Sequence, residues 1–415
     1  MARGYNRLPL AAALLATATS ASAAGGIQAG DWTLDIGGIV NAYYTTTSYS
    51  GSNAGSGPLG QQSGTAANKT NITTGLLPNY LIVSGKTRQN DLDVGFTISI
   101  QPGASTASGG GQSASQENRQ AFLTFGDASW GSIKLGKDLG IYASDAILND
   151  MTLLGVGSGA GHVANTTTLG RIGTGYMYAD WKSQIAYSTP NFNGFSATVG
   201  VTQAWDAVAY ADLLAAGTGS VVLGSATSNL RGGNSPAFEG KAAYEFAADA
   251  VKGKVWVSGL SQEVKGLTSA HNVSQTANAF DVGANANVAG FGLTAYYGAG
   301  SGIGQTIQFS DGFDAAGNKR DSEQWYLQAT YVLPTATKIG VSYGESKLDG
   351  NSGSADTFNS LKDSMVVVGA YHPLTKHLNL VAEYSETERQ IDAKAAGADT
   401  SAKAKTVSLG AILFF

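Results

Sequence analysis

Apolar and polar residues alternate along most of this 415-residue chain, and this period of two constrains the fold more than any other feature. In the last ten residues, Val407, Leu409, Ala411, Leu413 and Phe415 share one face. Four further segments alternate in the same way: residues 32–44, 92–100, 280–287 and 324–333. A period of two is typical of a half-buried β-strand, so the chain is predicted to be all-β.

The connections between these segments are short and long in turn. Short turns are expected at Arg88–Asn90, Asp127–Gly131, Pro190–Gly194, Asp249–Ala250, Ala289–Gly290, Pro334–Thr337 and Leu374–His377. Long polar segments are expected at residues 48–76, 102–116, 139–179, 204–235, 264–274, 301–321, 349–362 and 389–401. Seven short and eight long connections leave sixteen strands. This layout predicts a 16-stranded antiparallel transmembrane β-barrel with short periplasmic turns and long outer loops.

The composition excludes several other classes of protein. Charged residues make up only 13% of the chain, about half the usual share, which fits strands with one face in lipid. Cysteine is absent, which excludes a disulfide scaffold and a cysteine-based zinc site. The net charge of −5 argues against nucleic acid as the main partner. No segment reaches the roughly 18 consecutive apolar residues of a transmembrane helix.

The first 23 residues have the three regions of a secretory signal peptide. Arg3 and Arg7 form a basic start, residues 8–18 are apolar, and Ala21-Ser22-Ala23 is a small-x-small cleavage site. Cleavage is expected after Ala23 or Ala24, which leaves residues 24–415 as the barrel domain. Removing the two arginines takes the formal net charge from −5 to −7, which suggests a mild preference for cations. These features predict a protein of the bacterial cell envelope.

A soluble β-sandwich is the alternative to a barrel, and the aromatic residues argue against it. Trp32 and Tyr44 are twelve residues apart on one face, roughly 40 Å along a strand and about 30 Å after tilting. Both rings would then lie at the membrane interfaces. Further candidates for the aromatic girdles are Trp181, Phe195, Phe291, Tyr297, Tyr331 and Phe415. Because lipid tolerates no unpaired strand edge, the first and last strands must pair.

Three segments carry recognisable motifs. Ala121–Gly126 is followed by Trp130-Gly-Ser-Ile-Lys-Leu-Gly-Lys137, residues 187–195 read Tyr-Ser-Thr-Pro-Asn-Phe-Asn-Gly-Phe, and the last strand ends in Phe415. Together they resemble the general bacterial porins of Gram-negative outer membranes. The resemblance implies a homotrimer of sixteen-stranded barrels, each with a water-filled pore that the third outer loop narrows by folding inward. It also implies that Phe415 is the signal that the barrel-assembly machinery reads.

The third long segment, residues 139–179, is the candidate constriction loop, and Asp145 and Asp150 are its candidate acids. The family's Pro-Glu-Phe-Gly signature is missing, so which acid faces the pore stays open. The resemblance implies a basic pore-wall residue at Arg119, and Lys137 stands where the family has Arg. Strand parity adds further candidates for the lumen: Lys182, Glu239, Lys241, Glu245, Lys252 and Lys254. Acids on the loop that face bases on the wall would let hydrophilic solutes pass and disfavour apolar ones.

Other functions find little support in the sequence. The four histidines show no metal-ligand spacing, and neither a G-x-S-x-G motif nor a phosphate-binding glycine loop occurs. We therefore expect a channel for small hydrophilic solutes and ions, without a catalytic residue, metal or cofactor. The expected surroundings are outer-membrane lipid and lipopolysaccharide. Two alternatives stay open: a substrate-specific channel with a binding site in the constriction loop, and an outer-membrane enzyme or adhesin built on a barrel.

Overall fold

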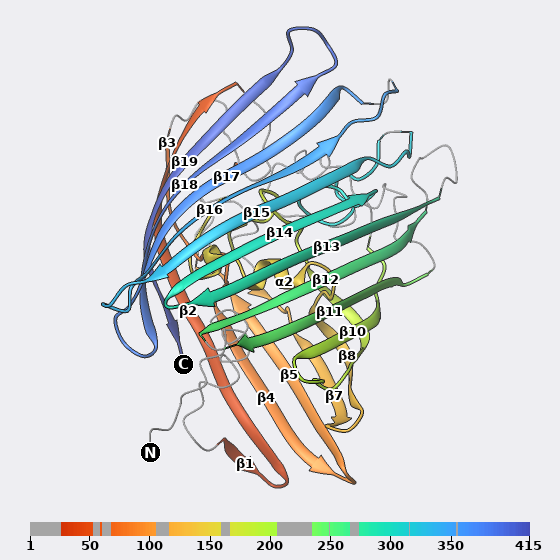
Figure 1. Ribbon diagram of the computed structural model, residues 1–415, viewed down its shortest axis with the longest axis vertical. Coiled ribbons are helices and arrows are strands. Elements are labelled where there is room, and N and C mark those ends of the chain that lie inside the picture. Colours follow the sequence, from red (N-terminus) through yellow and green to blue (C-terminus); the bar gives the residue numbers. More distant parts are fainter. Residues whose placement is uncertain are drawn as a thin grey trace.

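The computed structural model describes residues 26–52, 59, 68–104, 116–158, 167–205, 235–248, 250–265, 274–314, 316–353 and 356–415. The predicted signal peptide, residues 1–23, lies outside them. The described strands form one continuous antiparallel sheet that is wound into a barrel (Figure 1). Over the same residues, every helix is too short or too polar to cross a bilayer.

Sixteen barrel strands can be followed through the described residues, and fourteen of them are uninterrupted. These are β2 (Trp32–Gly51), β5 (Leu92–Pro102), β8 (Gly131–Leu139), β9 (Trp181–Ser188), β10 (Phe195–Thr202), β11 (Ala237–Ala248), β12 (Val251–Val264), β13 (Gln275–Val288), β14 (Phe291–Ser301), β15 (Asp321–Val332), β16 (Lys338–Asp349), β17 (Phe358–Pro373), β18 (Leu378–Ala393) and β19 (Thr400–Phe414). The remaining two barrel strands are each built from two pieces.

The second barrel strand consists of β3 (Asn68–Thr73) and β4 (Tyr80–Gln89), which both pair with β2. The fourth consists of β6 (Gln116–Glu117) and β7 (Ala121–Asp127), which both pair with β5. A short β1 (Ile27–Ala29) pairs with the start of β2. Two helices lie between β8 and β9: α2 (Ser144–Leu148) and the 3₁₀ helix η2 (Met151–Leu154).

The barrel closes through the first and last strands. β19 pairs with β2 from Phe414 opposite Ile39 to Ala402 opposite Gly51. Beyond this ladder, Gly38 and Phe415 exchange backbone N–H···O bonds of 2.9 and 3.1 Å. The closed sixteen-stranded antiparallel barrel is therefore confirmed, and its ladder consumes the strand backbone groups that lipid cannot satisfy.

All seven predicted turns join neighbouring strands, but several strands extend further than the alternation indicated. β2 continues to Gly51 and β18 to Ala393, while β3 lies inside the segment expected to be loop. At these outer ends both faces are polar, so the alternation disappears although the hydrogen-bonded ladder continues. Most of the predicted loop at residues 204–235 lies outside the described residues.

The two faces of each strand differ in exposure as the alternation predicted. On β2, Ile36, Val40 and Tyr44 are about half exposed on the outer face, at 51%, 52% and 50%. The alternate residues Tyr43 and Thr45 point inward and are each only 1% exposed. The outer face is thus apolar and open, and the inner face is covered.

The expected girdle residues lie on the outer face, with differences in their exposure. Tyr44, Phe195, Phe291, Tyr297 and Phe415 are 39–57% exposed. The rings of Trp32 and Tyr331 each pack against a neighbour: Trp32 lies 5.5 Å from Phe96, and Tyr331 lies 4.3 Å from Phe291.

Trp181 departs from this pattern. The Arg119 guanidinium lies 5.6 Å from its ring centre, and its indole nitrogen is buried. Trp181 is thus partly covered by the wall instead of open to lipid.

Candidate pore constriction

The loop between β8 and β9 enters the barrel, and two carboxylates on the wall hold it there. The Glu239 side chain on β11 accepts hydrogen bonds from the backbone N–H groups of Ile141 and Tyr142, at 2.8 and 2.9 Å. Glu383 on β18 accepts bonds from Val156 and Gly157, at 2.7 and 3.0 Å. β11 and β18 are the eighth and fifteenth barrel strands, so the two anchors stand on nearly opposite walls. Figure 1 shows the strands wound around α2 of this loop.

Further side chains on the wall satisfy the carbonyl groups of the loop between the two anchors. The Tyr326 hydroxyl on β15 donates to the Ala146 carbonyl at 2.9 Å, and the Tyr43 hydroxyl on β2 donates to the Leu154 carbonyl at 2.7 Å. Gln328 donates to the Asn149 carbonyl at 2.9 Å. Buried polar backbone groups need such partners, so the inward-facing polar residues of the strands define the path of the loop.

Apolar packing adds to these hydrogen bonds. Met151, Leu153, Leu154 and Val156 of the loop belong to one buried cluster with inward-facing side chains of the strands. Tyr43, Val367 and Val381 are among these strand residues. The main hydrophobic core thus lies inside the barrel, between the loop and the wall, because the outer face is reserved for lipid.

Asp145, one of the two predicted loop acids, lies in the first turn of α2 and is ion-paired with two lysines of the wall. The Lys241 ammonium on β11 is 3.2 Å from its carboxylate, and Lys254 on β12 contacts the other carboxylate oxygen. The Asp145 side chain is 4% exposed, whereas those of Lys241 and Lys254 are 27% and 16% exposed. Burial raises the pKa of Asp145, but the two lysines outweigh it and lower that pKa below its usual value. The cluster carries one net positive charge.

Asp150, the other predicted acid, forms hydrogen bonds with other residues of the loop. Its carboxylate accepts bonds from the Thr152 backbone N–H at 2.9 Å and the Thr152 hydroxyl at 2.5 Å, which caps η2. The Tyr176 hydroxyl donates to the same carboxylate at 2.8 Å. With 2% of Asp150 exposed, this acid holds the two limbs of the loop together.

Lys182 points inward, as its parity predicted, and forms a sealed ion pair. Its ammonium is 2.6 Å from Glu239, and neither side chain is exposed. Gln308 from the outer loop between β14 and β15 accepts a second bond at 2.6 Å, and Thr202 donates to Glu239 at 2.9 Å. Glu239 therefore binds both the loop backbone and Lys182.

The two bases implied by the family resemblance occupy different environments. Arg119 lies between β6 and β7, is 6% exposed, and has its Nε 2.7 Å from Glu117. Lys137 departs from its expected place on the pore wall. It pairs in register with Ala121 and Ser183 on the outer face, and the inward positions of β8 belong to Lys134 and Asp138, which form an ion pair. Successive residues of a strand point to opposite faces. The comparison with the family motif therefore misplaced Lys137 by one residue, because the next residue, Asp138, faces the lumen and Lys137 does not.

The other two predicted lumen charges lie toward the periplasmic end. Glu245 is near the end of β11 and Lys252 near the start of β12, next to the turn that joins these strands. Both side chains are exposed, and their parity is that of the inward residues Lys241 and Lys254. They belong to the mouth of the barrel and not to the loop contacts.

Glu383 was missed as a site residue, although a signal for it exists. It alternates with the outward residues Ala382 and Tyr384 on β18, so parity alone places it in the lumen. What the sequence does not show is its contact set: two backbone N–H groups of the loop and the Tyr371 hydroxyl, 2.6 Å away. Within the described residues, no group of three or more His, Cys, Asp or Glu side chains is placed to hold a metal.

A closed sixteen-stranded barrel with an apolar outer face and a loop held across its interior is the architecture of an outer-membrane channel. The chain belongs to the Gram-negative porin family, whose model matches residues 10–392. It is thus an outer-membrane porin, a channel through which small hydrophilic solutes diffuse passively.

Three solved structures show the same fold at low sequence identity. The outer membrane channel DcaP of Acinetobacter baumannii is 18% identical over 94% of this chain and 100% of its own, with a TM-score of 0.67. The anion-selective porin from Comamonas acidovorans is 15% identical over 92% of this chain and 100% of its own, with a TM-score of 0.59. Salmonella typhi OmpF in complex with daunomycin is 17% identical over 94% and 99%, with a TM-score of 0.55. No curated protein sequence matches the chain significantly.

Proposed function

We propose that the cluster of Asp145, Lys241 and Lys254 forms the charged face of the constriction and makes it favour anions over cations. The observation that carries this proposal is the pairing of one loop acid with two wall lysines that keep part of their surface exposed. The pairs Lys182–Glu239 and Lys134–Asp138 are each balanced, whereas this cluster has an excess positive charge. Selectivity depends on charge at the narrow point and not on the net charge of the chain, which alone would suggest cations.

Reversal potentials in a salt gradient across planar bilayers test this proposal. Replacing both lysines, Lys241→Gln with Lys254→Gln, is expected to shift the reversal potential toward cation preference. Asp145→Asn is expected to shift it toward anions. Lys252→Gln is the matched control, since it removes a lysine on the same barrel face but beside the periplasmic turn, where its register partners are Ala247 and Asn287, and it should cause a smaller shift. Equal shifts in the cluster and in the control would argue against the proposal.

The finer properties of the channel are also proposals. A substrate-specific channel would show a conductance block that saturates with one sugar, phosphate or carboxylate, and general diffusion would show none. The protein is proposed to be a homotrimer, which is supported by a trimer form among its structural neighbours, OmpT of Vibrio cholerae. Cleavage of residues 1–23 can be checked by N-terminal sequencing of the mature protein. The role of Phe415 in assembly can be checked by deleting it and measuring the folded protein in outer membranes.

A further inference from the structure

A second outer loop enters the barrel in addition to the constriction loop. Residues 302–314, here called the clamp loop, follow the outer end of β14 and are mostly buried. Ile303 and Phe309 are each 1% exposed. Both belong to one apolar cluster with Tyr142 and Met177 of the constriction loop. Burying these apolar side chains favours the inward path, so the clamp loop packs against the constriction loop inside the barrel.

The clamp loop has a compact shape and its own attachment to the wall. The Phe309 backbone N–H donates to the Ile303 carbonyl at 2.6 Å, which closes the chain between them into a turn. Gly304 has a φ of +86°, and a Cβ there would stand 1.9 Å from a carbonyl oxygen across the turn, so this position requires glycine. The Gln305 side chain donates to the Ser346 carbonyl of β16 at 2.5 Å. The wall therefore supports the clamp loop independently of the constriction loop.

Gln308 of the clamp loop contacts the constriction loop where that loop rejoins the wall. Its side-chain amide donates to the carbonyl groups of Tyr178 and Ala179, at 2.9 and 3.2 Å. The Tyr178 backbone N–H in turn donates to the Thr306 carbonyl at 3.1 Å. Buried backbone groups need such partners, so the position of this limb of the constriction loop depends on the clamp loop.

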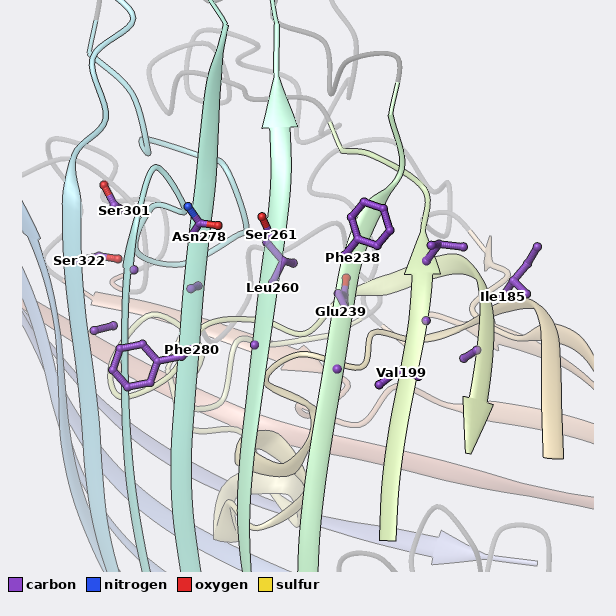
Figure 2. A pocket seen from close by; sticks show the side chains of 18 of the residues that line it. Ile185, Val199, Phe238, Glu239, Leu260, Ser261, Asn278, Phe280, Ser301 and Ser322 are labelled. Carbon is purple, nitrogen blue, oxygen red and sulfur yellow. The ribbon is translucent and has the colours of Figure 1, made fainter. Parts of the chain in front are cut away.

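The oxygen of the same amide connects to the limb where the constriction loop leaves the wall. It accepts a bond from the Lys182 ammonium at 2.6 Å, and that ammonium pairs with Glu239, which holds two backbone N–H groups of the leaving limb. Figure 2 shows Glu239 on β11 next to Leu260 of β12, which belongs to the same apolar cluster as the clamp loop. Gln308, 1% exposed, thus connects to both limbs of the constriction loop. The orientation of its amide follows from these partners, because ammonium groups only donate and carbonyl groups only accept.

We propose that Gln308 is a positioning residue of the channel, which fixes the neck of the constriction loop, residues 140–142 and 178–180. The helix α2 begins at Ser144, two residues after the first part of the neck, so the position of the neck determines where α2 stands in the lumen. The constriction loop is then fixed at two places, at the neck by Gln308 and further along by Glu383. This inference concerns the position of the loop and does not depend on the proposed preference for anions.

The test uses single engineered thiols, which react selectively because the native chain contains no cysteine. Ala179→Cys places a thiol at the neck, and Ala146→Cys places one in α2; both alanines are 0% exposed. The rate at which a hydrophilic methanethiosulfonate reagent modifies the purified channel reports how often each thiol is uncovered. When Gln308→Met is added, the neck thiol is expected to react about tenfold faster, whereas the α2 thiol keeps its rate.

Gln305→Met is the matched control, since it removes a buried glutamine of the same clamp loop that bonds to the wall and not to the neck. It should raise the rate at the neck thiol less than Gln308→Met does. Single-channel recordings without the thiols give an independent measurement, in which Gln308→Met is expected to increase the fluctuations of the open-channel current more than Gln305→Met. Discrete openings in each variant show that the barrel has folded.

Two outcomes would overturn the proposal. An unchanged rate at the neck thiol in Gln308→Met would show that Gln308 does not hold the neck. An equal increase at the neck and α2 thiols would show that Gln308 only stabilises the fold as a whole. Gln308→Glu keeps the acceptor for Lys182 but loses both donated bonds, so it should also uncover the neck thiol, and it decides the question if Gln308→Met does not assemble.

Discussion

At the scale of single residues, the charges around the constriction loop lie in ion-paired or hydrogen-bonded groups and not as isolated groups on the wall. Asp145 binds two lysines, Lys182 is sealed against Glu239, and Asp150 caps a helix. Strand parity predicted the inward direction of the wall charges, because it follows from the backbone. Their partners come from segments more than 50 residues away, which a local pattern cannot indicate.

If the Asp145 cluster sets ion selectivity as proposed, the selectivity is expected to depend on pH in a defined range. Its lysines lower the pKa of this carboxyl, so it stays ionised at pH 7 and 5 and is protonated only below the ordinary value of about 3.9. The stabilisation that this ion pair adds is present above that value and is lost as the pH falls through the lowered pKa. Protonation leaves both lysines unpaired, so anion preference should rise steeply only below about pH 4.

Reversal potentials of the native protein and of Asp145→Asn at pH 7, 5 and 3 check this expectation. The difference between the two proteins should stay constant from pH 7 to 5 and shrink only at a pH below the ordinary carboxyl value of about 3.9, because the pKa of Asp145 is lowered. Burial raises the pKa of Asp180, at the end of the loop, to about 6. Asp180 is present in both proteins, so its effect on the reversal potential cancels when the two proteins are compared. A difference that already shrinks between pH 7 and 5 would contradict the assignment.

At the scale of elements, the constriction loop has little secondary structure of its own and is shaped by the wall. Its helices α2 and η2 contain only five and four residues, too few to be stable alone. Gly155 brings the loop close to the β18 anchor: a Cβ there would stand 2.0 Å from a Glu383 oxygen. The resemblance to the porin family predicted that this loop folds into the barrel. The sequence did not show which strands hold the loop there.

Loosening the Glu383 anchor should change how the open channel behaves. Each hydrogen bond to a charged group contributes ~1.5–3 kcal/mol, and Glu383→Gln removes the charge that two loop N–H groups face. We expect larger current fluctuations in single-channel recordings, since the loop can leave the wall more often. Glu386→Gln is the control, because Glu386 lies on the same strand but faces outward. Indistinguishable noise in the two variants would show that Glu383 does not anchor the loop.

At the scale of the whole molecule, the closed ladder couples the two ends of the chain. β2 and β19 share thirteen register pairs, and Phe415 packs on Gly38, where a Cβ would stand 2.5 Å from its ring. Sixteen strands and seven short turns were predictable because alternation and turn residues are local features. The positions where strands are interrupted, at residues 74–79 and 118–120, were not predictable from the alternation. At the first of them, the Leu76 N–H donates to the Gly155 carbonyl of the constriction loop at 2.8 Å, a contact between residues far apart in the sequence.

A trimer of such barrels should resist detergent at room temperature. On gels of unheated samples the protein is expected to migrate as a species of about three chains, and after boiling as the 42.4 kDa chain less its signal peptide. Cross-linking at low protein concentration provides an independent count of subunits. A monomeric species in both measurements would refute the trimer and leave the single-barrel channel intact.

The sequence by itself determined the all-β barrel, its strand number and the face of each strand that meets lipid. Its motifs also indicated the porin family. These properties depend on the alternation of apolar and polar residues and on turn residues, which are both local features of the sequence. Only the tertiary structure decided that Asp145 is paired with two lysines, that Lys137 faces outward, and that Glu383 holds the loop. Each of these depends on the register between strands and on contacts across the lumen, where residues distant in the chain meet.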